Sequence, residues 1–216
     1  MRNEGAAGLA TMLALADSRL PIGGHVHSGG VEEAVSSGLL RDNASVELYL
    51  RRRIATTGLV TASLAAAVCG GALTPERAEL EGDARTPSPA ARAASRAQGR
   101  GLLRLAKQLW PHHDWTPAGA RPHLSTVFGM VGLACGARTD ELAGVVVYTT
   151  LTGAATAAQR LLALDPAAIA AGTMRLAPLC DRIAEEAALG LAALSDPVQD
   201  ALAERHLRRD MPLFAS

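Results

Sequence analysis

The stretch that decides the fold spans residues 139–164 and reads TDELAGVVVYTTLTGAATAAQRLLAL. Thr139 followed by Asp140 and Glu141 predicts a helix start, because a hydroxyl caps orphan N–H groups and acidic side chains favour the positive end of the helix dipole. Apolar positions then recur at helical spacing, and the three valines at 145–147 lie inside that longer period rather than in an alternating strand pattern. Small residues at 153–158 give a smooth face for close packing. We therefore expect a long, tightly packed helix over residues 140–164.

The composition of the whole chain favours helices. Alanine makes up about a fifth of the 216 residues, and aromatic residues only 3%. So few aromatics do not fill the core of a sandwich or barrel, whereas alanine is the best helix former. No stretch alternates long enough to predict a strand. The chain therefore reads as one all-α domain over residues 1–216, a single-domain helical bundle of about eight to ten helices.

Local signals place the other elements. Proline following a capping residue predicts helix starts at Thr74-Pro75, Ser88-Pro89, Asp165-Pro166 and Asp196-Pro197, the second of which extends to about Trp110. The remaining helices are expected at 7–16, from Ser28 to near Gly38, 45–69, 122–135, and 173–194 with a kink or interruption at Pro178. In the helix over 45–69, the arginines at 51–53 fall largely on the face opposite the apolar positions. Residues 111–121 are the least regular and predict a long surface loop.

Charge and cysteine usage exclude several classes of protein. The chain has 21 basic and 21 acidic residues and a pI near 7.0, whereas binding nucleic acid or an anionic membrane as the main task requires a basic excess. It shows no basic leader ahead of an apolar run and no apolar span of 18 residues, so we expect neither a signal peptide nor a membrane helix. Cys69, Cys135 and Cys180 lie far apart, which fits small buried side chains in a reducing compartment. A cytoplasmic protein is expected.

The densest group of chemically distinctive residues is GGHVHSGG at 23–30. A phosphate-binding loop is disfavoured there, because no strand precedes the glycines and no Lys-Ser/Thr pair follows them. His25 and His27 either share a metal ion or hydrogen-bond locally, and no third ligand lies nearby in the sequence. They are the weak candidates for a metal site.

No catalytic set is identifiable elsewhere. Ser28 has histidine neighbours but lacks a nucleophile elbow, and the carboxylates in Glu32-Glu33 and Glu185-Glu186 are adjacent and point apart on a helix. The polar run at 112–114 is typical of a solvated loop, and His123 and His206 are isolated in the sequence. We therefore expect no enzymatic activity and no tightly bound cofactor.

Glycines inside the helix predicted from Ser88 to Trp110 need an explanation. Gly99 and Gly101 flank Arg100, and each glycine in a helix interior costs about 1 kcal/mol relative to alanine. Close approach of another helix or of a partner chain would compensate. Arg92, Arg96 and Arg100 are spaced by four residues and form one stripe, which faces either an acidic partner or solvent.

The sequence resembles the UreF family of urease accessory proteins over nearly the whole chain. The resemblance rests on several short motifs and single residues in a characteristic order, which we call the UreF marks. They are Leu20-Pro21-x-Gly23-Gly24, Ser28-x-Gly30-Val31-Glu32, Asp83 with Arg92, Ser95, Gly99 and Arg100, the run AAQRL at 157–161, Ser195-Asp196-Pro197, His206, and LFAS at 213–216. The chain departs from the family pattern at His25-Val26-His27, where the family has an aromatic residue, at Val31, at Asp165-Pro166, and at Pro212, where it has arginine. Contacts made by that aromatic or that arginine do not transfer.

The resemblance implies a dimerising, non-enzymatic scaffold that joins the accessory protein UreD, also called UreH, to the nickel-binding GTPase UreG. The complex delivers Ni²⁺, handled only transiently, to the active site of apo-urease and regulates GTP hydrolysis. The homodimer would use the small-residue faces at 99–101 and 153–158. Residues matching the family marks are the expected partner-binding set: Pro21, Gly23, Ser28, Gly30, Glu32, Arg92, Arg100, Arg160, Leu213 and Phe214. Residues 210–216 form a partner-docking tail, with folding back of Phe214 onto its own domain as the alternative.

Two other classes of function are alternatives for this chain. An all-α dimeric transcription regulator fits the length, but it would carry a basic helix-turn-helix, which the neutral charge and the acidic Glu32-Glu33 helix disfavour. A helical-bundle metal hydrolase using His25 and His27 would bind metal stoichiometrically.

Overall fold

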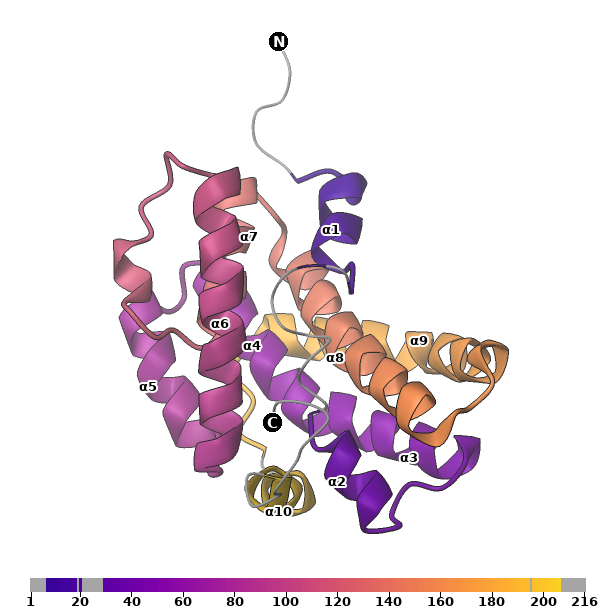
Figure 1. The fold of residues 1–216 in the computed structure, drawn as a ribbon. Coiled ribbons are helices and arrows are strands. Elements are labelled where there is room, and N and C mark those ends of the chain that lie inside the picture. Colours follow the sequence, from indigo (N-terminus) through magenta and orange to yellow (C-terminus); the bar gives the residue numbers. More distant parts are fainter. Residues whose placement is uncertain (1–6, 19, 21–28, 195, 207–216) are drawn as a thin grey trace.

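A computed structural model describes residues 7–18, 20, 29–194 and 196–206 of the chain. This part contains ten α-helical segments and no strand, which confirms the all-α class (Figure 1). The α-helices are α1 Leu9–Leu15, α2 Val31–Ser36, α3 Asn43–Arg53, α4 Leu59–Cys69, α5 Pro75–Arg85, α6 Pro89–Leu109, α7 Leu124–Cys135, α8 Thr139–Leu162, α9 Pro166–Leu189 and α10 Pro197–His206. No helix in the described ranges is both long and apolar enough to cross a bilayer.

The helix expected over 45–69 is one continuous rod with a wider turn in its middle. It begins at Asn43, because Asp42 and Ser45 form a reciprocal capping box in which the Asp42 carboxylate accepts from the Ser45 N–H at 2.8 Å. A π-helical turn, Ile54–Gly58, joins α3 to α4. Such turns insert one extra residue per turn and redirect the side chains that follow.

The core surrounds α4, which lies in the middle of the fold between α7, α8 and α9 (Figure 1). The alanines at 154, 155, 157 and 158 are all buried within this chain. Most of the smooth face predicted on α8 therefore packs inside the molecule, whereas Thr156 is half-buried and Gly153 has open space around it. The residue that caps α8 is Arg138 and not Thr139, which is the first residue of the helix.

Gly99 is explained by a close approach within the chain. A Cβ atom at this position would collide with the backbone carbonyl oxygen of Pro122 and lie 2.9 Å from the carbonyl carbon of His123. The segment that leads into α7 thus crosses α6 directly over Gly99, and only glycine leaves room for it. The contact that compensates for this glycine comes from the same chain.

The predicted bounds of two helices are wrong. The N-terminal cap of α2 is Gly30, in the left-handed region at φ 85°, so the helix starts after Ser28, which lies outside the described residues. The helix expected at 173–194 is instead the second half of α9, which starts at Pro166, continues through the exposed Pro178 and ends at Leu189.

The loop at 111–121 is also more structured than expected. It contains a 3₁₀ turn, Thr116–Ala118, and buries Trp115, whose indole N–H donates to the carbonyl of Trp110 at 3.1 Å. The caps predicted at Thr74, Ser88, Asp165 and Asp196 are confirmed, because each side chain accepts from a backbone N–H in the first turn of its helix.

Candidate functional site

Two helices that lie far apart in the sequence, α2 and α10, pack against each other (Figure 1). Gly30 sits at the contact, since a Cβ atom there would lie 3.2 Å from the Tyr49 hydroxyl and 3.3 Å from Cβ of Leu202. Gly29 precedes it, also with positive φ, and its carbonyl accepts from the Tyr49 hydroxyl at 3.0 Å. The glycines therefore allow the chain to turn sharply against α3 and α10 and to enter α2.

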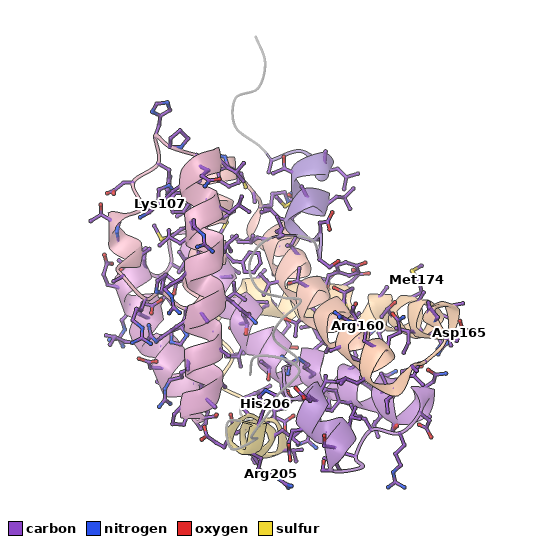
Figure 2. The ribbon with its side chains drawn as sticks, in the orientation of Figure 1. Lys107, Arg160, Asp165, Met174, Arg205 and His206 are labelled. Atoms are coloured by element: carbon purple, nitrogen blue, oxygen red, sulfur yellow. The ribbon has the colours of Figure 1, made fainter. Side chains whose placement is uncertain are left out.

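The adjacent carboxylates of α2 both reach α10. Glu33 pairs with Arg205 at 3.0 Å, and Oε2 of Glu32 lies 3.8 Å from Nδ1 of His206. Glu32 and His206 are almost completely buried, at 3% and 2% exposure. Figure 2 shows Arg205 and His206 at the end of α10. His206 is therefore not isolated, as its sequence position suggested, but faces a carboxylate of α2 that is 174 positions away in the sequence.

Two arginines of α3 bind the beginning of α10. Arg52 donates two hydrogen bonds of 2.7 Å to the carboxylate of Asp196, the residue that caps α10. Arg53 donates to the Gly29 carbonyl at 2.7 Å and to Oε1 of Gln199 at 2.5 Å. Arg51 and Arg52 are exposed, as the face predicted for the arginines implies, but Arg52 and Arg53 also contact α10, which the sequence did not predict.

Burial and hydrogen bonding act in opposite directions on Asp196. Burial raises its pKa, but hydrogen bonds from Arg52 and from the backbone N–H of Gln199 outweigh burial and bring the pKa below its usual value. For Tyr49, burial raises the pKa of the hydroxyl above its usual value, although Arg53 and Gln199 act against it. The junction therefore combines an ionised carboxylate, cationic arginines and a neutral phenol.

A pocket of about 190 Å³ opens beside this junction, between α4, α6 and α10. Arg53 and Gln199 line it on one side and Ser95 and Gln98 of α6 on the other. Asp200 also lines it, and burial together with the nearby carboxylates of Asp196 and Glu204 raises the pKa of its carboxyl. The pocket connects the α2–α10 junction to the residues of α6.

A second polar cluster joins α5, α6 and the start of α7. The buried ring of His123 lies 3.0 Å from both Ser95 Oγ and Asp83 Oδ1. Arg96 bridges Glu79 at 2.7 Å and Asp83 at 2.9 Å. His123 is thus not isolated either, and the acidic partner of Arg96 belongs to this chain.

The remaining predicted site residues are spread over the surface or fall outside the described residues. Arg92 lies 3.8 Å from Asp83 and donates to the Thr86 carbonyl, whereas Arg100 is exposed on α6 and Arg160 is exposed near the end of α8 (Figure 2). Seven predicted residues lie outside the described part: Pro21, Gly23, His25, His27, Ser28, Leu213 and Phe214. Within the described part, no group of three His, Cys, Asp or Glu side chains is placed to hold a metal ion.

Comparison with known proteins decides the family. The UreF family model matches residues 40–177, which is more than half of the chain. The chain belongs to the UreF family. It is 64% identical over 211 residues to the urease accessory protein UreF of Mycolicibacterium vanbaalenii, covering 96% of this chain and 99% of that protein. The UreF proteins of Mycobacterium marinum and Mycobacterium tuberculosis are 60% and 56% identical over 208 residues, each again covering 96% of this chain and 99% of the relative.

The UreF marks, scattered in sequence, form two groups in space. Gly30, Val31, Glu32, Asp196 and His206 meet at the α2–α10 junction, although about 165 residues separate the two ends of the chain involved. Asp83, Arg92, Ser95 and Gly99 gather around His123. Sequence reasoning missed Arg52, Arg53 and Gln199, since only the packing of α10 brings these side chains together.

Proposed function

We propose that this UreF-family chain is a non-catalytic subunit of the urease maturation machinery. It bridges UreD (UreH) and the GTPase UreG and regulates the GTP-dependent delivery of Ni²⁺ to apo-urease. Membership of a family whose relatives are named urease accessory proteins supports the role in maturation. The bridging role is what the resemblance to the UreF family implies, and the UreF marks at both ends of the chain support it.

One observation carries the proposal. The described chain enters the α2–α10 junction at Gly29 and leaves it at His206, and Glu32 and His206 face each other there. Gly29 follows directly after the predicted partner-binding residues at 21–28, and the tail at 210–216 follows α10, so each segment has one end that is joined to the chain near this junction. A single partner, UreD, is able to bind both segments there at once, with the junction as their common base.

In this proposal the nickel ion is cargo, and no cofactor is bound tightly. His25 and His27 are the candidate side chains for contact with Ni²⁺, because neutral imidazole is a good ligand for nickel.

The chain works as a homodimer. Gly153, with open space around it on α8, is the position where the expected small-residue contact between copies remains available.

Co-purification tests this role directly. The full-length chain is co-expressed with UreD and UreG, and the complex is assayed for GTP- and Ni²⁺-dependent activation of apo-urease. We expect a ternary complex and activation that depends on this chain, whereas the purified chain alone hydrolyses no GTP. Failure to capture UreD, or GTP hydrolysis by the chain alone, would contradict the proposal.

The histidines are tested in the same assay with the double variant H25A/H27A. Retained UreD capture with lost activation supports a role for these side chains in nickel handling. Full activation by the double variant shows instead that the two histidines are incidental and leaves the scaffold role intact.

A further inference from the structure

The outward side of α6 carries positive charge that the described part of the chain does not neutralise. Residues 84–113 contain no aspartate or glutamate, although the whole chain has equal numbers of acidic and basic residues. The helix α6 carries Arg92, Arg96, Arg100, Arg104 and Lys107. At 3.6 residues per turn these five side chains fall within a sector of about 120° and extend over about 22 Å of the helix.

Only the first half of this stripe is neutralised. Arg96 pairs with Glu79 and Asp83, and Arg92 lies within 3.8 Å of Asp83, so α5 supplies two carboxylates for two arginines. The sequence left open whether the arginine stripe faces an acidic partner or solvent. For Arg92 and Arg96 the acidic partner is α5 of the same chain. The cations of the stripe that remain available to a partner therefore lie toward the C-terminal end of α6.

The second half consists of Arg100, Arg104 and Lys107, all exposed. None of the three has a carboxylate within ion-pair distance among the described residues. Figure 2 shows Lys107 on α6, on a side that none of the labelled helices covers. Like charges three and four residues apart repel one another and disfavour the helix that carries them.

Arg121, for which the described residues supply no ion pair, continues this surface. Arg121 is exposed and lines a shallow surface pocket together with Arg92, Arg96 and Pro89. Among the described residues, the six cations around α6 face two carboxylates of α5, which leaves an excess of four positive charges in this part of the structure. We name Arg100, Arg104, Lys107 and Arg121 the basic face.

We infer that the basic face binds an acidic segment of another polypeptide. The spacing of four and three residues between Arg100, Arg104 and Lys107 matches carboxylates spaced by three and four residues on a partner helix. A nucleic acid is disfavoured as occupant, because α6 presents no aromatic side chain for bases to stack on and the whole chain lacks a basic excess. This surface is separate from the α2–α10 junction and does not depend on the proposed function.

The test uses a defined probe and the full-length protein. The probe is a fluorescein-labelled, alanine-based helical peptide of 21 residues with glutamates spaced alternately by four and three residues, and its control has glutamine at those positions. Binding is measured by fluorescence anisotropy at 50 mM NaCl. We expect the glutamate peptide to bind, the glutamine peptide not to bind, and the affinity to fall at least tenfold at 300 mM NaCl.

Charge reversal then locates the site. The variant R100E/R104E/K107E is expected to bind the glutamate peptide at least tenfold more weakly, and the neutral variant R100Q/R104Q/K107Q at least threefold more weakly. The matched control R41E/R51E/R182E makes the same change in net charge at exposed arginines away from α6 and is expected to stay within twofold of the wild type. Circular dichroism confirms that each variant is folded, and the glutamine variant decides the question if the reversal variant is not.

Three results would overturn the inference. They are unchanged peptide binding in the folded α6 variants, an equal loss in the matched control, and tighter binding of a 20-nucleotide single-stranded RNA than of the glutamate peptide. Capture of UreD and UreG by the α6 variants is measured in parallel. Loss of peptide binding with retained capture of both proteins would confirm the basic face and leave the proposed function unaffected.

Discussion

Arg52 of α3 holds Asp196, the residue that caps α10, through two hydrogen bonds of 2.7 Å across 144 positions of sequence. The carboxylate of Asp196 is 1% exposed, whereas the Arg52 side chain is 51% exposed. The same carboxylate accepts from the N–H groups of Val198 and Gln199. This pair therefore fixes the start of α10, and with it the place of His206 opposite Glu32.

We expect Asp196→Ala to lower the free energy of unfolding by about 1–2 kcal/mol, because it removes an N-terminal cap. Arg52→Ala should also destabilise the protein, since it leaves a buried carboxylate without its main donor. Arg175→Ala is the control: it breaks an exposed ion pair with Glu47 and should cost less than about 1 kcal/mol. Urea unfolding followed by circular dichroism measures all three. Equal effects of Arg52→Ala and Arg175→Ala would contradict this assignment.

The protein should lose stability in acid partly through Asp83. Burial raises the pKa of this carboxyl, but hydrogen bonds from His123 and Arg96 outweigh burial, so the pKa in the folded state lies below its usual value. The resulting stabilisation is fully present above the unfolded-state pKa of about 3.9 and is lost as pH falls through the lower folded-state pKa. Asp83→Asn does not titrate and should therefore show a smaller drop in unfolding free energy between pH 6 and pH 3. A drop as large as in the wild type would refute this role.

Gly99→Ala should destabilise the protein by about 1–3 kcal/mol, because the new methyl group collides with backbone atoms of Pro122 and His123, which cannot move as a flexible side chain does. Gly153→Ala is its matched control in another helix. With no atom within 4 Å of the new methyl group, this change should stabilise α8 by about 0.5–1 kcal/mol. Both values are measured by urea unfolding. A neutral Gly99→Ala variant would show that the crossing over α6 is looser than the structure indicates.

Gly30→Val should abolish capture of UreD while most of the helicity remains. A valine at this position would have to adopt a positive φ, and its Cβ atom would press against Tyr49 and Leu202. We therefore expect the backbone at the α2–α10 junction, to which the proposed partner-binding segments are joined, to move. Gly38→Val has a similar φ of 74° but open space around it, and should cost only the backbone strain of about 1–2 kcal/mol. Co-purification with UreD separates the two variants. Equal capture by both would remove the junction from the interface.

Deleting residues 210–216 should leave a folded, helical protein that neither captures UreD nor supports urease activation. Burial of Leu213 and Phe214 on a partner contributes about 3–6 kcal/mol before the cost of ordering the segment. Co-purification and circular dichroism of the truncated chain measure the two outcomes. Capture of UreD at the wild-type yield would exclude tail docking. Aggregation would favour the alternative that Phe214 packs on its own domain.

Much of the helical layout was predictable from local chemistry. The caps at Thr74, Ser88, Asp165 and Asp196 act within three residues of themselves, so the sequence alone locates them. The predictions went wrong where distant contacts decide the outcome. The helix α9 continues through the exposed Pro178, so the predicted interruption is absent. The Ser28 cap was wrong because Gly29 and Gly30 turn against Tyr49, a residue of α3.

The sequence by itself determined the all-α class, most helix starts and the family, since alanine content, capping residues and ordered marks are properties of local stretches. Only the tertiary structure decided that Glu32 faces His206, that Arg96 binds α5, and that Arg100, Arg104 and Lys107 keep no partner among the described residues. Helical periodicity tells which side of a helix a charged residue occupies. Whether another helix neutralises that charge depends on which elements pack there, and the long-range packing of α5 and α10 settles it.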